Sequence, residues 1–119
     1  MTLSGRRFLI VEDEAIIAMM LEDAVAGAGG EVLPSVASVA EALAALETLA
    51  PDAVLLDLQL GLHSALPVAW RLQALGIPYV ICTGFGEPAL PPGATPHRVL
   101  FKPVEFDVLL AALETLPRR

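Results

Sequence analysis

Phe8-Leu9-Ile10-Val11, followed directly by Glu12-Asp13-Glu14, is the stretch that decides the fold of this chain. Three later apolar runs also end in polar or charged residues: Ala53-Val54-Leu55-Leu56 before Asp57, Tyr79-Val80-Ile81-Cys82 before Thr83-Gly84, and Val99-Leu100-Phe101 before Lys102-Pro103. Apolar runs without polar alternation are typical of strands buried on both faces of a parallel sheet. Ligands of such sheets bind beyond the carboxyl ends of the strands. The pattern therefore predicts one site where these polar residues meet.

Helices are expected between the strands. Apolar residues at helical spacing predict helices over residues 14–28, 38–49 and 104–116, and a further helix that ends at Gly76. We expect the first helix to bury Ile17, Met20, Leu21, Ala24 and Val25, and the last to bury Phe106, Leu109, Leu110 and Leu113. Ser38 and Glu41 form a capping-box pattern, while a shorter strand is expected over 31–36 and a loop over 61–64. This alternation predicts an α/β fold, a doubly wound five-stranded parallel sheet with helices on both faces.

The segment over residues 84–97 departs from this alternation because it is rich in proline, with Pro88, Pro91, Pro92 and Pro96. Proline lacks a backbone donor and clashes with the preceding helical turn, so a full helix cannot form here. At most one turn is expected, around residues 87–90. The sequence therefore predicts a degenerate fourth helix.

The composition restricts the class of protein. The 119 residues suffice for one core, and we expect a single domain over residues 1–119. The net charge of −7 is unfavourable for nucleic acid, because neutralising phosphates supplies most of that affinity. No apolar stretch is long enough to cross a bilayer, no secretory signal pattern is present, and the single cysteine, Cys82, fits a reducing compartment. We expect a cytoplasmic protein with protein partners, and with neither nucleic acid nor membrane as a partner.

Carboxylates follow the first and third strands, at Glu12, Asp13 and Asp57. Hard divalent cations such as Mg²⁺ bind carboxylate oxygens together with water and phosphate oxygens. A carboxylate beside such a cation can attack phosphorus, because the metal offsets the repulsion between two anions. Thr83 and Lys102 would offer a hydroxyl and an ammonium to the phosphoryl oxygens. The residues predict an aspartyl-phosphate site.

Each of these residues also has a purely structural alternative. Asp57 by itself is compatible with a turn, and Glu12-Asp13-Glu14 with a helix N-terminus, which acids favour; Glu14 is expected to do only that. Thr83 could simply end a strand, and Lys102 could be a surface lysine before a helix-opening proline. The apolar run before each residue favours the site.

Taken in order, these residues resemble the receiver domain of bacterial two-component response regulators over essentially the whole chain. The resemblance implies the flavodoxin-like receiver fold, Asp57 in Leu55-Leu56-Asp57-Leu58 as the phosphoacceptor, and Mg²⁺ as the cofactor. It implies that four oxygen donors hold the metal: Glu12, Asp13, Asp57 and the backbone carbonyl of Gln59. It also implies that Thr83 moves toward the phosphoryl group and that Lys102, before an expected cis bond to Pro103, senses it.

A second, partial resemblance concerns Pro78-Tyr79-Val80-Ile81-Cys82-Thr83-Gly84-Phe85-Gly86. It is similar to the Pro-Phe-x-Phe-Ala-Thr-Gly signature of the FAT GUY receivers, typically small stand-alone regulators of signalling and stress pathways, although Tyr79, Ile81 and Cys82 replace Phe, Phe and Ala. Receivers ordinarily carry a switch aromatic three residues before the lysine, where this chain has Val99. We hypothesise that the 84–97 loop, with Phe85, replaces both this ring and the missing helix as the moving part.

The function implied by the resemblance is that of a response regulator. Asp57 would accept a phosphoryl group from a histidine kinase or a histidine phosphotransfer protein. The output would be binding to an unknown effector protein, or simple draining of phosphoryl groups. The chain would be an acceptor that promotes its own phosphorylation and dephosphorylation, and not an enzyme. Two alternatives stay open: an aspartate-nucleophile phosphohydrolase, which Gln59 in the place of a general acid disfavours, and a phosphorylation-independent scaffold with the receiver fold.

Overall fold

The structure is a computed structural model that describes residues 2–84 and 93–117. Its central sheet is parallel and has the strand order β2–β1–β3–β6–β7. The strands are β1 (Arg7–Val11), β2 (Glu31–Val32), β3 (Ala53–Leu56), β6 (Tyr79–Gly84) and β7 (Arg98–Lys102). The helices are α1 (Ala15–Gly27), α2 (Val39–Thr48), α3 (Leu66–Leu75) and α4 (Phe106–Glu114). The strand order is that of a flavodoxin-like doubly wound sheet, which confirms the predicted fold class.

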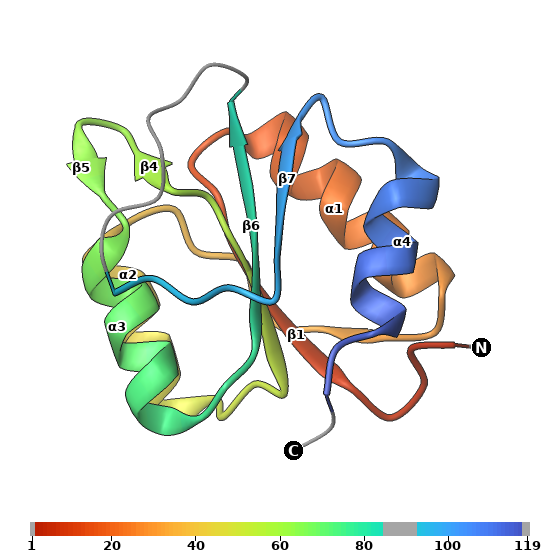
Figure 1. Cartoon of the computed structure of the whole chain (residues 1–119), viewed down its shortest axis with the longest axis horizontal. Helices are drawn as coiled ribbons and strands as arrows, with labels where there is room; N and C mark the ends of the chain where they lie inside the picture. The colour runs from red at the N-terminus through yellow and green to blue at the C-terminus, as the bar shows by residue number, and fades with distance from the viewer. Residues whose placement is uncertain (1, 85–92, 118–119) are drawn as a thin grey trace.

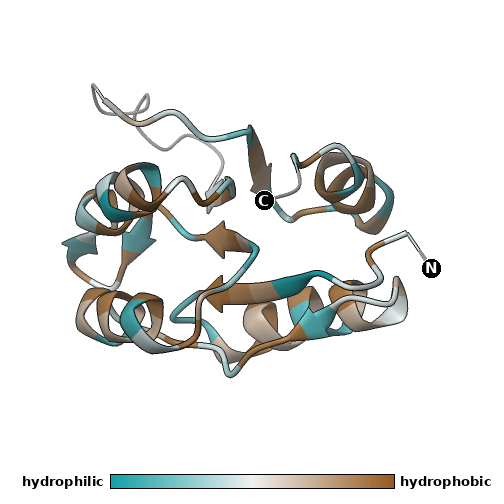
Figure 2. Cartoon of the chain, turned by 90° about the horizontal axis from the view of Figure 1, so that it is seen from below, coloured by the Kyte–Doolittle hydropathy of each residue, from teal (hydrophilic) through white to brown (hydrophobic). Residues whose placement is uncertain are grey.

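Helices cover both faces of this sheet (Figure 1). Phe8 and Ile10 of β1 belong to the core beneath α1 and α4, whereas Leu9 and Val11 belong to the core beneath α2 and α3. Figure 2 shows the mostly hydrophobic strands between the two helical layers. Because successive side chains point to opposite faces and both faces are covered, the four buried residues of β1, residues 8–11, are all apolar. This explains the uninterrupted run in the sequence.

Most element ends lie where the sequence predicts them. Ser38 Oγ accepts a hydrogen bond from the Glu41 amide at 3.1 Å, and so caps α2 as expected. Gly76 ends α3 in the left-handed conformation, with φ of 71°. The expected strand over 31–36 is shorter, since β2 ends at Val32 and only an isolated bridge joins Val36 to Val11. Pro34, which has no N–H to donate, lies between the two.

Two residues expected in the core are exposed. Met20 of α1 has 59% of its surface exposed and Phe106, the first residue of α4, has 53%. Leu21 and Leu109 on the same helices are buried, as predicted. Helical spacing identifies an apolar stripe, but the width of the stripe that is covered depends on how closely the neighbouring helix approaches. Here α1 and α4 leave the edges of their stripes uncovered.

Two loops predicted from the sequence have different outcomes. The expected 61–64 loop is part of a two-stranded antiparallel hairpin of β4 (Gln59–Leu60) and β5 (His63–Ser64). In the 84–97 segment, Gly84 ends β6 and residues 93–97 contain no helix. The expected turn at 87–90 and Phe85 lie outside the described residues. None of the helices in the described ranges is long and apolar enough to cross a membrane.

Candidate functional site

The sheet brings the predicted acidic residues to one edge. β1 and β3 pair in parallel from Phe8 beside Ala53 to Val11 beside Leu56, so the next residues along each strand emerge together. Carboxylate oxygens of Glu12, Asp13 and Asp57 lie within 4.8 Å of one another. Glu12 and Asp57 are buried, and Asp13 is exposed. The edge thus combines two shielded carboxylates with one open to solvent.

Lys102 enters this edge from the end of β7. Its Nζ lies 2.7 Å from Glu12 Oε1 and 3.0 Å from Asp57 Oδ2. Burial lowers the pKa of Lys102, but hydrogen bonds to Glu12 and Asp57 outweigh this effect, so its pKa is raised. The ammonium therefore stays charged and offsets the repulsion between the two buried carboxylates. The peptide bond from Lys102 to Pro103 is cis, as expected.

Backbone amides hold the two buried carboxylates in place. Glu12 Oε2 accepts a hydrogen bond from the Glu14 amide at 3.1 Å, and Asp57 Oδ1 accepts one from the Gln59 amide at 3.1 Å. Burial raises the pKa of Glu12 to about 7, and the hydrogen bond from Lys102 offsets only part of this rise. A metal cation bound to Glu12 would compete with this proton, because a carboxylate ligand must be deprotonated.

Gly61 is a member of the site that was not predicted from the sequence. Its amide donates a 2.8 Å hydrogen bond to Asp13 Oδ2, which ties the hairpin of β4 and β5 to the end of β1. Gly61 has φ of 60°, in the left-handed region that favours glycine. In the sequence, only the preference of glycine for two-residue hairpin turns could have pointed to Gly61.

Thr83 lies at the end of β6, near the same edge. Its side chain is 2% exposed, and Oγ1 makes no hydrogen bond to the described residues. Across the sheet, Thr83 pairs with Phe101 of β7, whereas Val99 pairs with Ile81. Val99 is half-buried on the core beneath α2 and α3, while Phe101 is 52% exposed. Among the described residues, the aromatic residue that pairs with Thr83 is therefore Phe101, which was not predicted from the sequence.

A cavity of about 230 Å³ opens at this edge, and its lining includes Asp13, Asp57, Gln59, Gly84 and Lys102. Carboxylates and backbone carbonyls are the oxygen donors that Mg²⁺ takes in proteins, together with water. The acidic cluster, with one exposed and two buried carboxylates, suits such a cation. Glu12, Asp13, Asp57 and the carbonyl of Gln59 are the groups that would hold it. The role of the Gln59 carbonyl stays a prediction.

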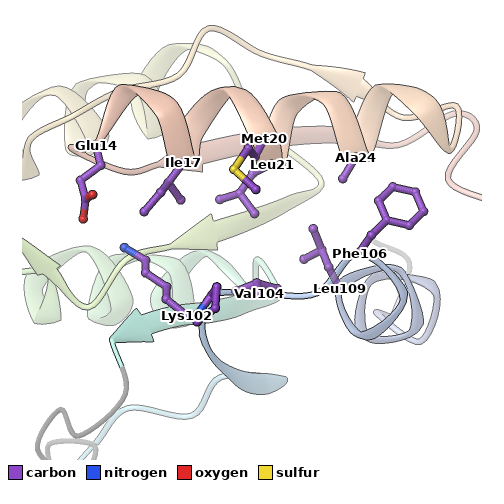
Figure 3. Close-up of a pocket in the computed structure, with 10 residues that line it drawn as sticks. Glu14, Ile17, Met20, Leu21, Ala24, Lys102, Val104, Phe106 and Leu109 are labelled. Carbon is purple, nitrogen blue, oxygen red and sulfur yellow. The ribbon is translucent and has the colours of Figure 1, made fainter.

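An apolar groove of about 430 Å³ lies between α1 and α4, next to this cavity (Figure 3). Glu14 and Lys102 line both spaces, and they face each other at one end of the groove. Its other lining residues are apolar: Ile17, Met20, Leu21, Ala24, Pro103, Val104, Phe106 and Leu109. Glu14, expected only at the N-terminus of the first helix, directly precedes α1, and its side chain makes no capping hydrogen bond.

The chain matches the family model of the response regulator receiver domain over residues 8–114, and it belongs to this family. It is 31% identical to the transcriptional regulatory protein PdtaR of Mycobacterium tuberculosis over 115 residues, which cover 92% of this chain and 55% of PdtaR. The chain thus spans about half the length of that relative. It is also 28% identical to the chemotaxis protein CheY of Thermotoga maritima over 88 residues, 72% of this chain and 73% of CheY. The resemblance to receivers is thereby confirmed.

A solved structure extends this similarity to the fold. The solution structure of SdrG from Sphingomonas melonis Fr1 is 38% identical in sequence and superposes with a TM-score of 0.81. The match covers 95% of each chain. Together with the family match, it places this chain in two-component signalling as a receiver domain.

Proposed function

We propose that this receiver accepts a phosphoryl group at Asp57 from a phosphohistidine, in a phosphorelay that requires Mg²⁺. The observation that carries the proposal is the position of Lys102 Nζ, within 3.0 Å of Asp57 and 2.7 Å of Glu12 beside the exposed Asp13. This arrangement pairs a shielded nucleophile with a cation and leaves one open side for a donor. It supports a phosphoacceptor over an enzyme with an external substrate.

In the proposed step a carboxylate oxygen of Asp57 forms a bond to phosphorus, while the bond from phosphorus to the histidine nitrogen breaks. The nitrogen leaves with the electron pair and later takes up a proton. Lys102 and Thr83 would hold the oxygens of the transferred group, because an ammonium and a hydroxyl can both donate to them. Bound Mg²⁺ would offset the repulsion between the carboxylate and the incoming phosphoryl group. Asp57 and its chain neighbours Leu56 and Leu58 are all buried, so the nucleophile is largely shielded from water.

The surface around the cavity supports a protein as the donor. Ile16, Met19 and Met20 of α1 are 59% to 75% exposed, and Leu62 at the hairpin tip is 95% exposed. Grouped apolar side chains of this kind mark interaction surfaces of soluble proteins. Because the groove between α1 and α4 shares Glu14 and Lys102 with the acidic cavity, a helix of a histidine kinase or histidine phosphotransfer protein would reach both.

The test is phosphotransfer from purified histidine kinases and phosphotransfer proteins of the source organism, with Mg²⁺ present. Intact-mass measurement should show the addition of one phosphoryl group, and Asp57→Ala should abolish it. Asp23→Ala, which removes an exposed aspartate of α1, is the matched control and should be labelled normally. Labelling that survives in Asp57→Ala would overturn the proposed acceptor.

We also propose that the chain belongs among the FAT GUY receivers and that its output is binding to an effector protein or draining of phosphoryl groups. The motif from Pro78 to Gly84 supports the subfamily, and Val99 in place of the usual aromatic agrees with a changed switch. An effector pulled down only by the beryllofluoride-treated protein would support an active signal. Phosphoryl transfer without any such partner would support a sink.

Two alternative functions have weaker support. In a phosphohydrolase a general acid would be expected where Gln59 stands, but the side chain of Gln59 is a neutral amide that donates to the Gly61 carbonyl at 3.2 Å. Turnover of a small phosphomonoester would revive this alternative. In a phosphorylation-independent scaffold, Asp57→Ala would leave effector binding unchanged. The intact set of carboxylates, with Thr83 and Lys102, favours the phosphoacceptor over both.

A further inference from the structure

Residues 93–97, which we call the return segment, lead into β7 and contain no helix or strand. The segment starts close to α3. A Cβ added to Gly93 would lie 3.4 Å from Trp70 Nε1, and Gly93 has φ of 90°. The backbone therefore passes against the indole of Trp70 in a conformation that favours glycine. A segment that lacks regular structure needs other partners for its backbone groups.

Gln73 of α3 supplies most of these partners. Its Nε2 donates to the Gly93 carbonyl at 2.7 Å, and its Oε1 accepts from the Thr95 amide at 2.9 Å. The same Oε1 also accepts from the Tyr79 hydroxyl. One side chain thus satisfies a carbonyl and an amide of the return segment and holds a second side chain in place.

Tyr79, at the start of β6, completes the arrangement. Its side chain is 1% exposed, and its hydroxyl accepts a second hydrogen bond from the Thr95 amide at 3.0 Å. The carbonyl of Tyr79 accepts from the His97 amide at 2.8 Å. Pro96, between these two donors, has no N–H. The amides of Thr95 and His97 are therefore both bonded to β6 or α3.

The hydrogen bonds of Gln73 and Tyr79 to the return segment lie at the end of β6 that is far from the phosphorylation site. Tyr79 and Thr83 lie on the same face of β6, four residues apart, which is about 13 Å along a strand. Thr83 is at the phosphorylation edge, and Tyr79 is at the opposite end of the strand. The chain between β6 and β7 thus has one end at the site and the other end bound to Gln73 and Tyr79.

We propose that the side chains of Gln73 and Tyr79 form a static anchor for the return segment, so that residues 93–97 keep their position whether or not Asp57 is phosphorylated. The response to phosphorylation, which rests on the function proposed above, is then confined to the Thr83 and Gly84 end of the connection. The sequence analysis expected the whole 84–97 loop to move on phosphorylation. The anchor excludes residues 93–97 from that movement. The anchor acts by positioning backbone and takes no part in phosphoryl transfer.

Amide hydrogen exchange with and without beryllofluoride and Mg²⁺ tests the anchor. Beryllofluoride mimics a phosphoryl group on a carboxylate. In the wild-type protein we expect slowed exchange at Thr95 and His97 that beryllofluoride leaves unchanged, while exchange at Thr83 and Gly84 changes. Equal responses at both ends would overturn the proposal.

Variants test the anchor without any phosphorylation. Tyr79→Phe keeps the buried ring and removes one acceptor, and Gln73→Leu removes the other contacts. Loss of a neutral hydrogen bond should speed exchange of the Thr95 amide about fivefold in each variant, and more in the double variant. Acrylamide quenching of Trp70, the only tryptophan, should rise in Gln73→Leu. Ala74→Leu, which adds a leucine at an exposed position of α3, is the control and should change neither measurement.

The outcomes separate this inference from the proposed function. Unchanged exchange at Thr95 in Tyr79→Phe and Gln73→Leu would overturn the anchor even if Asp57 is phosphorylated normally. If beryllofluoride changes no amide, including Thr83, the proposed function fails, and the variants still decide whether the anchor exists. Amides of β1 and β3 should remain far more protected than Thr95 in every variant, which shows that the fold is intact.

Discussion

The two ends of β6 are held by different kinds of interaction. At the Thr83 end, charged groups from β1, β3 and β7 meet: Lys102 contacts Glu12 and Asp57 at 3.0 Å or less. At the Tyr79 end, neutral groups of Gln73, Tyr79 and Thr95 bond to one another. A cluster of charges responds strongly when a further charge is added, whereas neutral hydrogen bonds do not. The difference indicates that one end of the strand is built to respond and the other to stay in place.

The largest expected effect concerns the metal at the charged end. Asp13→Asn removes the exposed carboxylate of the cluster and should lower the affinity for Mg²⁺ about 100-fold, because a neutral amide is a poor ligand for a hard cation. Isothermal titration calorimetry measures this affinity. Asp23→Asn, at an exposed position of α1, should bind Mg²⁺ as the wild type does. Equal affinities of Asp13→Asn and the wild type would remove Asp13 from the metal site.

A charged side chain far from the site, Arg6, is expected to stabilise the fold. Buried Arg6 donates from Nη1 to the carbonyl of Leu113, in the last turn of α4, at 3.3 Å and to that of Leu116, just after the helix, at 3.1 Å. Cations favour helix C-termini, and charge-assisted hydrogen bonds are stronger than neutral ones. Arg6→Met should lower the free energy of unfolding by about 2 kcal/mol in urea denaturation. Arg98→Met, which removes an exposed arginine that donates to the adjacent His97 carbonyl, should have little effect.

A third prediction uses pH. In metal-free protein the folded state keeps the proton of Glu12 up to pH about 7, whereas the unfolded chain releases it near the ordinary pKa of 4.5. The folded state thus binds more protons between these values, so the contribution of Glu12 to the free energy of unfolding falls as pH rises from about 4.5 to about 7. Glu12→Gln should flatten this fall in urea denaturation with excess chelator. An unchanged pH profile would contradict the raised pKa.

The smallest effect is expected at the neutral end. Tyr79→Phe should lower the free energy of unfolding by about 1 kcal/mol, the usual contribution of one neutral hydrogen bond. It should leave the Mg²⁺ affinity unchanged, since Tyr79 is at the far end of β6 from the acidic cluster. Calorimetry and urea denaturation of the same sample measure both quantities. A loss of Mg²⁺ affinity comparable to that of Asp13→Asn would break the distinction between the two ends.

Much of this molecule could be predicted from local patterns. The strands were evident because both faces of the sheet are covered, and Glu12, Asp13, Asp57 and Lys102 were evident because they directly follow those strands. Met20 and Phe106 were misplaced because helical spacing does not say how far a neighbouring helix extends. The hairpin over residues 59–64 was missed because its strands have two residues each. Strands of two residues are too short to show the alternation of apolar and polar residues by which a strand is predicted.

The amino-acid sequence by itself determined the class of fold, the edge of the sheet at which the site forms and the charged residues that reach it. These features depend on residues that are adjacent in the chain. An apolar run forms a buried strand, and the polar residue after it lies at the end of that strand. Only the tertiary structure decided that Gly61 holds Asp13, that Phe101 and not Val99 lies beside Thr83, and that Gln73 and Tyr79 hold Thr95. Strand register and hydrogen bonds between distant neutral side chains depend on how the elements pack, and no local pattern records them.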